Sequence, residues 1–135
     1  MIVVAIVAIL AAIALPAYQK QIMQSRESSA KSALLDLARR EETYYSNYNY
    51  YTTQLDSLGY ANITGNAIQV PNNTNENYYT VTVTPASSGT TAATYTATAT
   101  PVAGSTQAND PCQIYQIDYL GNQTATGTPT SGSCW

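Results

Sequence analysis

The sequence predicts an α+β protein in which one long N-terminal helix packs on a small antiparallel sheet of three to four strands, with a disulfide-closed loop at the C-terminus. Three observations support this fold class. The chain begins with an unbroken apolar block, continues with apolar residues at helical spacing, and later contains two segments in which Thr alternates with apolar residues. At 135 residues, the chain has room for one modest domain and an accessory segment.

The apolar block covers Met1 to Leu15 and contains no polar or charged side chain. A buried helix of a soluble protein would be expected to show one polar face, and this block has none. A membrane span needs roughly 20 apolar residues, so 15 is slightly short. A secretory signal should have a basic region ahead of its apolar core, and nothing precedes Met1. We therefore expect residues 1–20 to form a membrane-spanning or helix-packing segment, with a signal anchor of a monomeric protein as the alternative.

Helical spacing continues after Pro16, and predicts an amphipathic helix over residues 21–46. Glu27 with Lys31 and Asp36 with Arg40 are acid-first i,i+4 pairs that favour this helix. Proline removes a backbone hydrogen bond and clashes with the preceding turn, so we expect the long helix to be bent or partly unwound near Pro16.

Residues 47–77 are predicted to be a connecting loop, with a short strand near 67–70. The sheet and disulfide region is expected over residues 78–135. Its best strands are Tyr78–Thr84 and Thr94–Thr100, which form a hairpin through a turn at residues 87–89, and further strands are expected near 113–119 and 123–125.

The two cysteines, Cys112 and Cys134, are predicted to form a disulfide, with two free buried thiols as the alternative. All five basic residues lie between Lys20 and Arg40, and the chain beyond Glu42 carries four acids and no Lys or Arg. A surface with a formal charge of −4 repels phosphate backbones, so no nucleic-acid partner is expected.

We expect no enzymatic activity, no metal and no cofactor. The chain has no His for a hydrolytic triad and no Gly-rich phosphate loop. Asp110, Asp118 and Glu76 lack the dense oxygen spacing of a calcium loop. The tyrosine cluster at residues 44–51 is interpreted as packing rather than as a path for electron transfer.

The string MIVVAIVAILAAIALPAYQKQ resembles the start of type IV pilins, whose mature chain begins Phe-Thr-Leu-Ile-Glu-Leu before such an apolar helix. The segment SAKSALLDLARREETYYSNYNYYT and the ending Leu-Gly, then Cys-Trp, are similar to PilE-like pilins. The resemblance implies that six residues, including a family glutamate, precede Met1. Many members have Gly where Ala8 stands, so unwinding would depend mainly on Pro16.

The resemblance implies a structural subunit that leaves the inner membrane and polymerises into a type IV pilus on the cell surface, for adhesion, motility or related tasks. Its expected partners are identical subunits, the pilus assembly machinery and a prepilin peptidase. The alternative is a minor pilin or pseudopilin that primes assembly or binds a ligand such as DNA. The residues expected in the filament core are Val3, Val4, Ile6, Val7, Ile9, Leu10 and Ile13.

Three Asn-X-Thr sequons are candidate glycosylation sites, although such short patterns arise easily in an Asn- and Thr-rich chain. They begin at Asn62, Asn72 and Asn122.

Overall fold

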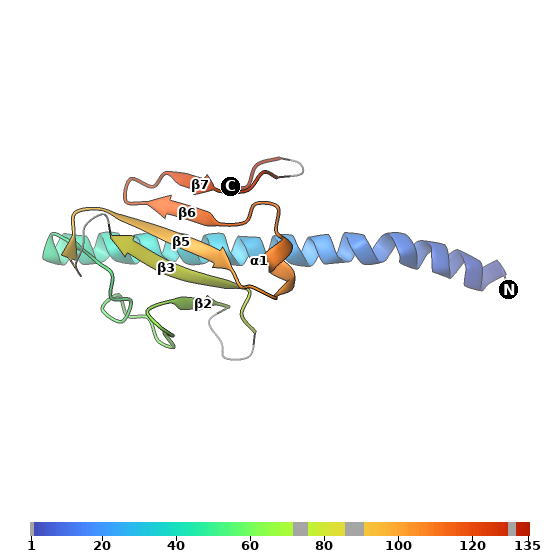
Figure 1. Cartoon of the computed structure of the whole chain (residues 1–135), viewed down its shortest axis with the longest axis horizontal. Helices are drawn as coiled ribbons and strands as arrows, with labels where there is room; N and C mark the ends of the chain where they lie inside the picture. The colour runs from blue at the N-terminus through green and yellow to red at the C-terminus, as the bar shows by residue number, and fades with distance from the viewer. Residues whose placement is uncertain (1, 72–75, 86–90, 130–131) are drawn as a thin grey trace.

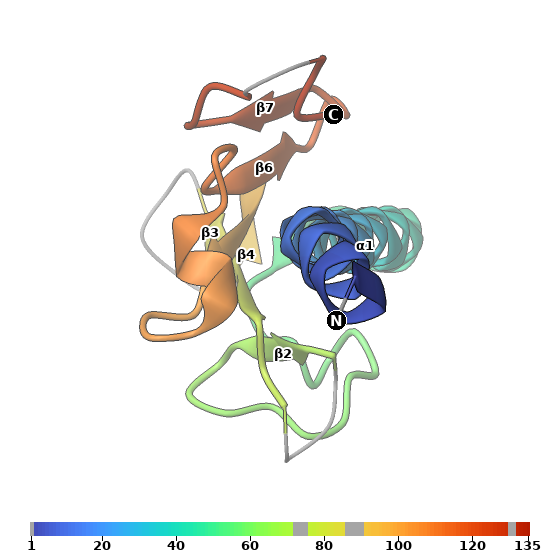
Figure 2. The ribbon, with the colours of Figure 1, turned by 90° about the vertical axis from the view of Figure 1, so that its right-hand side faces the viewer.

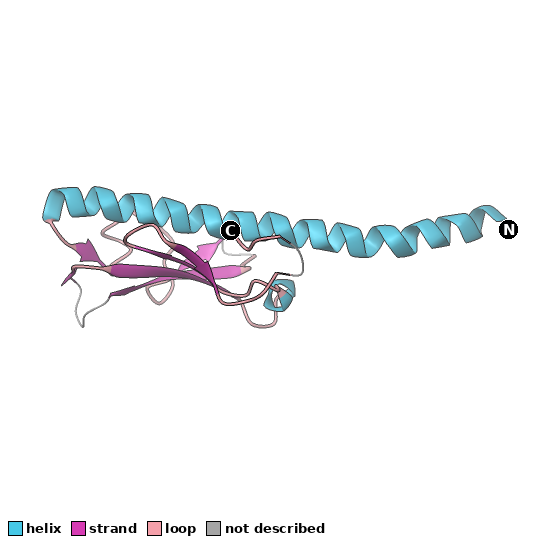
Figure 3. Cartoon of the chain, turned by 90° about the horizontal axis from the view of Figure 1, so that it is seen from above, coloured by secondary structure: helices cyan, strands magenta, loops and turns pink. Residues whose placement is uncertain are grey.

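The computed structural model describes residues 2–71, 76–85, 91–129 and 132–135. Helix α1 (Ile2–Tyr48) runs along the whole molecule, and a sheet packs on its C-terminal half (Figure 1). Seen from above, the N-terminal half of α1 extends well beyond the sheet (Figure 3). We call residues 21–135 the head. The predicted α+β class, with a long helix on an antiparallel sheet, is confirmed.

The main sheet has five antiparallel strands in the order β2-β3-β5-β6-β7, one more than the upper end of the predicted three to four. It covers one side of α1, from β2 at the bottom to β7 at the top of Figure 2. The short strands predicted near residues 67–70 and 123–125 are β2 and β7, and both belong to this sheet. The bounds are β2 Ile68–Val70, β3 Tyr79–Pro85, β5 Tyr95–Pro101, β6 Tyr115–Asp118 and β7 Gln123–Ala125.

A separate two-stranded sheet, which the sequence analysis did not predict, joins β1 (Tyr51–Thr52) to β4 (Thr91–Ala92) near the C-terminal end of α1. A short 3-10 helix, η1 (Thr106–Asn109), lies between β5 and β6 in the chain. The turn predicted at residues 87–89 lies outside the described residues.

The alternation of β3 and β5 decides which side chains form the core. Their apolar residues are buried against α1, whereas the threonines between them lie on the other face. The two strands pair antiparallel, with Val81 opposite Ala99. The helix contributes Ala30, Leu34 and Leu37, which are fully buried in the same cluster. Helical spacing on α1 and period-2 spacing on the strands therefore meet in one core.

The helix was expected to be bent or partly unwound near Pro16; α1 passes through Pro16 without interruption, so the unwinding is not found in the single subunit. Figure 3 shows only a gentle curve in the N-terminal half. A proline removes one intrahelical hydrogen bond, but the residues on either side keep theirs. Ala14 and Ala17 flank this region and favour the helix, which explains why one missing bond does not end it.

The loop after α1 is anchored on the helix, as the sequence suggested. Leu55 and Leu58 are buried, and the Tyr60 hydroxyl donates to Asp36 Oδ2 at 2.8 Å. The predicted pair of Asp36 with Arg40 forms, at 2.8 Å. Glu27 and Lys31 form no ion pair within the described part of the chain, because the Lys31 ammonium lies over the Tyr115 ring, 5.1 Å from its centroid.

Candidate functional site

The N-terminal half of α1 is the largest apolar surface in the described structure. All seven residues expected in a filament core are exposed, from 52% for Ile6 to 72% for Val3. This stretch is long and apolar enough to cross a membrane by length and composition, with a mean hydropathy of 2.4 and no buried residue. Exposed apolar surface of this extent marks an interaction surface, because a stable soluble monomer rarely carries it.

The head begins where α1 meets the disulfide region. A cavity of about 390 Å³ lies here, between Pro16, Met23 and Glu27 of the helix and Pro111 and Cys112 of the loop after η1. The side chain of Gln107 also joins the two parts, because its Nε2 donates to the carbonyl oxygen of Met23 at 3.3 Å. This bond ties η1 to α1 immediately after the exposed segment of the helix.

A buried polar cluster fixes the disulfide region on the sheet. The hydroxyls of Tyr79 and Tyr115 both donate to Asp110 Oδ2, and Gln107 Nε2 donates to the Tyr79 hydroxyl at 2.9 Å. The backbone N–H of Cys112 donates to Asp110 Oδ1 at 2.9 Å. Burial, followed by the charge of Asp110, raises the pKa of Glu27. The cluster stabilises the fold, since its members hydrogen-bond one another.

Cys112 and Cys134 form the predicted disulfide, with 5.7 Å between their Cα atoms. The last residue, Trp135, packs edge-on against Tyr115, with 5.8 Å between ring centroids. Its indole N–H donates to the carbonyl oxygen of Thr124 in β7 at 2.7 Å. These contacts hold the C-terminus on the sheet.

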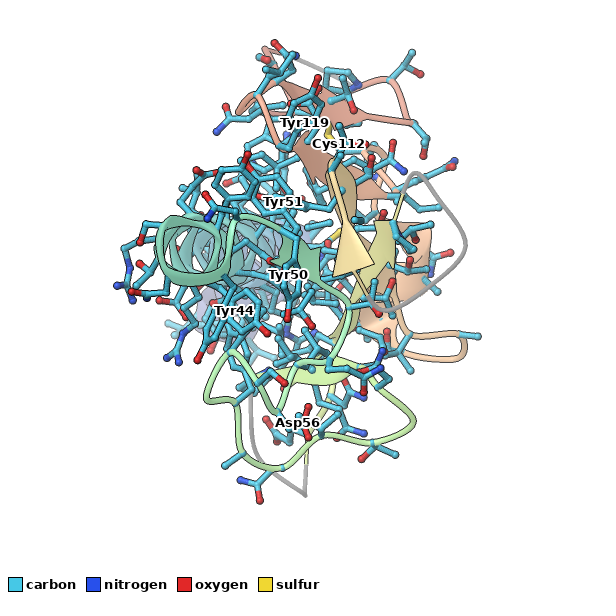
Figure 4. The ribbon with its side chains drawn as sticks, turned by 90° about the vertical axis from the view of Figure 1, so that its left-hand side faces the viewer. Tyr44, Tyr50, Tyr51, Asp56, Cys112 and Tyr119 are labelled. Atoms are coloured by element: carbon cyan, nitrogen blue, oxygen red, sulfur yellow. A yellow bond between two sulfur atoms is a disulfide. The ribbon has the colours of Figure 1, made fainter. Side chains whose placement is uncertain are left out.

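The tyrosine cluster divides into two groups at the far end of α1. Tyr44 lies below the end of the helix and Tyr51 above it, with Tyr50 beside the helix between them (Figure 4). Tyr51 is buried and contacts Tyr95 edge-on at 4.8 Å, which agrees with a packing role. Tyr48 is 56% exposed, so this group also reaches the surface.

Four of the five basic side chains are engaged inside the head. Arg26 lies over the Tyr78 ring, 3.6 Å from its centroid, and Lys31 over Tyr115. Arg39 and Arg40 both donate to Asp36, at 2.7 and 2.8 Å. Burial alone would raise the pKa of Asp36, but hydrogen bonds from Arg39, Arg40 and Tyr60 outweigh it and lower this pKa to about 2.

The residues considered for metal binding do not come together. Asp110 lies in the buried tyrosine cluster, whereas Asp118 accepts the backbone N–H groups of Leu120 and Asn122. In the described ranges, no group of three or more His, Cys, Asp or Glu residues could hold an ion.

The sequons differ in their surroundings. Asn62 is exposed in the connecting loop. Asn122 is also exposed, but its side-chain amide donates to Asp118 Oδ2 at 2.8 Å, so a sugar there would compete with this bond. Asn72 lies outside the described residues.

A family model covering residues 16–116 matches the chain, and it is described as "Type IV minor pilin ComP, DNA uptake sequence receptor". The chain belongs to this family of type IV minor pilins. The match runs from Pro16 in α1 to the first half of β6, and it includes the remainder of the helix and the strands β2, β3 and β5 of the main sheet. The resemblance that the sequence analysis stated is therefore confirmed.

Solved structures agree on the type IV pilin fold. A type IV pilin from Shewanella oneidensis has a TM-score of 0.53 and 22% identity, over 84% of this chain and 97% of that one. The non-core minor pilin PilV of Neisseria meningitidis has a TM-score of 0.51 and 22% identity, over 82% of this chain and 93% of that one. No curated protein sequence matches the chain.

Sequence reasoning missed two features of this pilin. Glu41 is fully buried on the face of α1 that meets the sheet, and its spacing of four from Leu37 was the available signal. The second is a groove beside Arg39, Arg40 and Tyr48, which forms only when the loop at Ser57 and Leu58 folds against the helix. Spacing along the helix could not reveal the partner segment.

Proposed function

We propose that this type IV pilin is a minor, non-enzymatic subunit of a pilus, held in the inner membrane before assembly and exposed on the cell surface afterwards. The observation that carries the proposal is the exposure of all seven apolar residues expected in the filament core. After extraction from lipid, these side chains need apolar neighbours, which the corresponding helices of other subunits provide. Contacts between non-equivalent surfaces that do not close into a ring generate helical filaments.

Small residues between the large ones support close helix packing. Ala5, Ala8, Ala11 and Ala12 alternate with the large apolar side chains, and small residues let helices approach in membranes and in helix bundles. The minor role is the alternative that the sequence analysis named, and the family description supports it over a principal subunit.

The test is the content of sheared surface filaments. We expect the chain to copurify with them in clear excess of membrane contamination but far below the principal subunit. Ile9→Asp should remove it from filaments, because a charge in a dry apolar interface is costly. Gln54→Asp, at an exposed position in the head, is the matched control and should leave incorporation unchanged.

Two outcomes would contradict this proposal. Finding the chain as the most abundant filament protein would assign it the principal role. Finding it only in membranes, with wild type and Ile9→Asp indistinguishable, would make the apolar helix a plain membrane anchor.

DNA binding is the second candidate function, because the family model is described as a DNA uptake sequence receptor. This description weighs against the expectation that the protein has no nucleic-acid partner. The charge distribution supports that expectation, since the head beyond Glu42 has no Lys or Arg. Fluorescence anisotropy of labelled duplex DNA with the full chain in detergent distinguishes DNA binding from the absence of a nucleic-acid partner. Binding that weakens with added salt and with Lys20→Gln supports the receptor role.

A further inference from the structure

A groove of about 390 Å³ lies at the far end of the head, between the last turns of α1 and the loop that follows β1. It is distinct from the apolar surface at the other end of α1. Helix residues form one wall, and the loop residues Ser57 and Leu58 form the other. Its size falls within the range of small-molecule sites in proteins, roughly 300 to 1,000 Å³. The helix residues are Arg39, Arg40, Thr43, Tyr44, Asn47 and Tyr48.

The groove is rich in hydrogen-bond donors. A guanidinium carries five N–H donors. The described contacts of Arg39 use one nitrogen, Nη2, which donates to Asp36, and the Arg39 side chain is 69% exposed. Arg40 is held in place by Asp36 and by the carbonyl oxygen of Leu58, at 2.8 and 2.9 Å. Arg39 therefore keeps donors for a ligand, beside a second arginine that the fold fixes.

Aromatic rings form the rest of the helix wall. Tyr48 packs against Tyr44 with the ring planes tilted by 32° and 4.5 Å between ring centroids, yet it stays 56% exposed. Tyr44 in turn contacts Tyr50 edge-on at 5.6 Å, and their hydroxyls lie 3.3 Å apart. These contacts hold Tyr48 in one orientation, with part of its surface open to a ligand ring. A rigid aromatic side chain supplies contact area at low conformational cost.

The arrangement suits a ring that carries an acidic group. Arginine binds a carboxylate through two parallel N–H bonds, and a sugar ring packs on an aromatic face. Asp36 pairs with both arginines, so these three side chains together carry one net positive charge. A single net positive charge gives little attraction for a long polyanion, but it can hold one carboxylate in a charge-assisted hydrogen bond.

We propose that this groove binds an acidic saccharide, with its carboxylate on Arg39 and its pyranose ring against Tyr48. Thr43, Asn47 and Ser57 also line the groove. The Thr43 hydroxyl and the Asn47 amide nitrogen donate to helix carbonyl oxygens, so their oxygens serve as acceptors for the sugar hydroxyls. The proposal goes beyond filament assembly, because it assigns the distal end of the head a ligand of its own.

The test uses the full chain in a polyoxyethylene detergent, because detergents with sugar head groups would compete. Saturation-transfer NMR is recorded with methyl glucuronide and with methyl glucoside, which differ at the acidic group. We expect transfer to the glucuronide, weakened at least roughly tenfold in affinity by Arg39→Gln or Tyr48→Ala, as the loss of one charge-assisted bond or one ring contact predicts.

Tyr45→Ala is the matched control, because Tyr45 is exposed but stacks on Tyr51, at 4.6 Å, outside the groove. It should bind the glucuronide as wild type does, and circular dichroism checks that each variant is folded. Equal binding of glucuronide and glucoside, or equal losses in Tyr45→Ala and Tyr48→Ala, would overturn the proposal. So would binding of oligodeoxythymidylate without the glucuronide, which would assign the groove to nucleic acid.

Discussion

The Glu41 carboxylate accepts the backbone N–H of Thr52 at 3.1 Å, and this bond ties the end of α1 to β1. Glu41 is fully buried, and its other oxygen, Oε1, has no hydrogen-bond partner among the described residues. Burial raises the pKa of Glu41 to about 7, against the opposing effect of the Thr52 bond, and the charge of Glu42 adds to the increase. Tyrosines 44, 51 and 95 are the other titratable groups that interact with it.

Glu41 should make the head less stable as the pH rises. The folded state holds the proton up to about pH 7, whereas the unfolded chain releases it near the ordinary pKa of 4.5. The free energy of unfolding therefore falls by on the order of 3 kcal/mol between pH 4.5 and 7. It is constant above that window. Glu41→Gln should flatten this part of the curve in denaturant unfolding of the full chain. Glu42→Gln removes only the smallest contribution to the raised pKa of Glu41, so it should change the slope much less than Glu41→Gln does. Equal slopes for wild type and Glu41→Gln would contradict the assignment.

Gly127 leaves no room for a side chain. A Cβ atom built on it would lie 2.0 Å from the carbonyl oxygen of Pro111, a backbone atom that cannot rotate away. Gly127 also donates its N–H to the Cys112 carbonyl oxygen at 3.0 Å. We expect Gly127→Ala to cost about 1–3 kcal/mol of unfolding free energy, by overpacking. Thr128→Ala, at the exposed next position, should change the thermal midpoint little; similar midpoints for both variants would count against the close approach.

The disulfide should contribute a large share of the stability of this small head. It joins residues separated by 22 positions, and closing a loop of that length contributes roughly 3 kcal/mol in the chain-entropy model. The double variant Cys112→Ser, Cys134→Ser should lose about that much in denaturant unfolding. Dithiothreitol should destabilise wild type by a similar amount and have no effect on the variant. A wild type that is insensitive to reduction would show that the buried cluster around Asp110 is sufficient.

Pro16 should be a weak point of the helix even though the helix continues through it. Its missing N–H leaves the carbonyl oxygen of Ala12 without its usual partner, and a proline in a helix interior costs about 3 kcal/mol or more. We expect Pro16→Ala to slow amide hydrogen exchange at residues 13–20 in detergent. Amides of β3 and β5 in the same sample serve as the control and should not change. Unchanged exchange next to residue 16 would mean that the helix is already fully stable there.

Regular alternation was the most informative part of the sequence. The predicted strands 78–84 and 94–100 differ by one residue from β3 and β5, and Tyr79, Val81 and Val83 lie on the core face as expected. The short pair of β1 and β4 has two residues in each strand, so no periodicity could reveal it. It depends on contacts between distant segments, as Tyr51 opposite Ala92 illustrates.

The candidate sites were predictable to different degrees. The apolar surface of α1 follows from composition alone, because every residue from 1 to 15 is apolar. The groove near Arg39 does not follow from the sequence. The sequence pattern indicates that Asp36 pairs with Arg40, but Leu58, which completes the groove, lies 18 positions after Arg40 in the chain. Glu41 lies between these cases: its spacing of four from Leu37 is a signal for the buried face, but a charged residue is not expected there without a partner.

The hydrogen bond from Trp135 to Thr124 has a consequence for protein aggregation. β7 is an edge strand, and an edge presents backbone groups that can recruit a strand from another molecule. The indole N–H occupies one of these backbone acceptors and places a bulky ring beside the strand. Where many copies crowd together, this cap disfavours the addition of a strand from another molecule at β7.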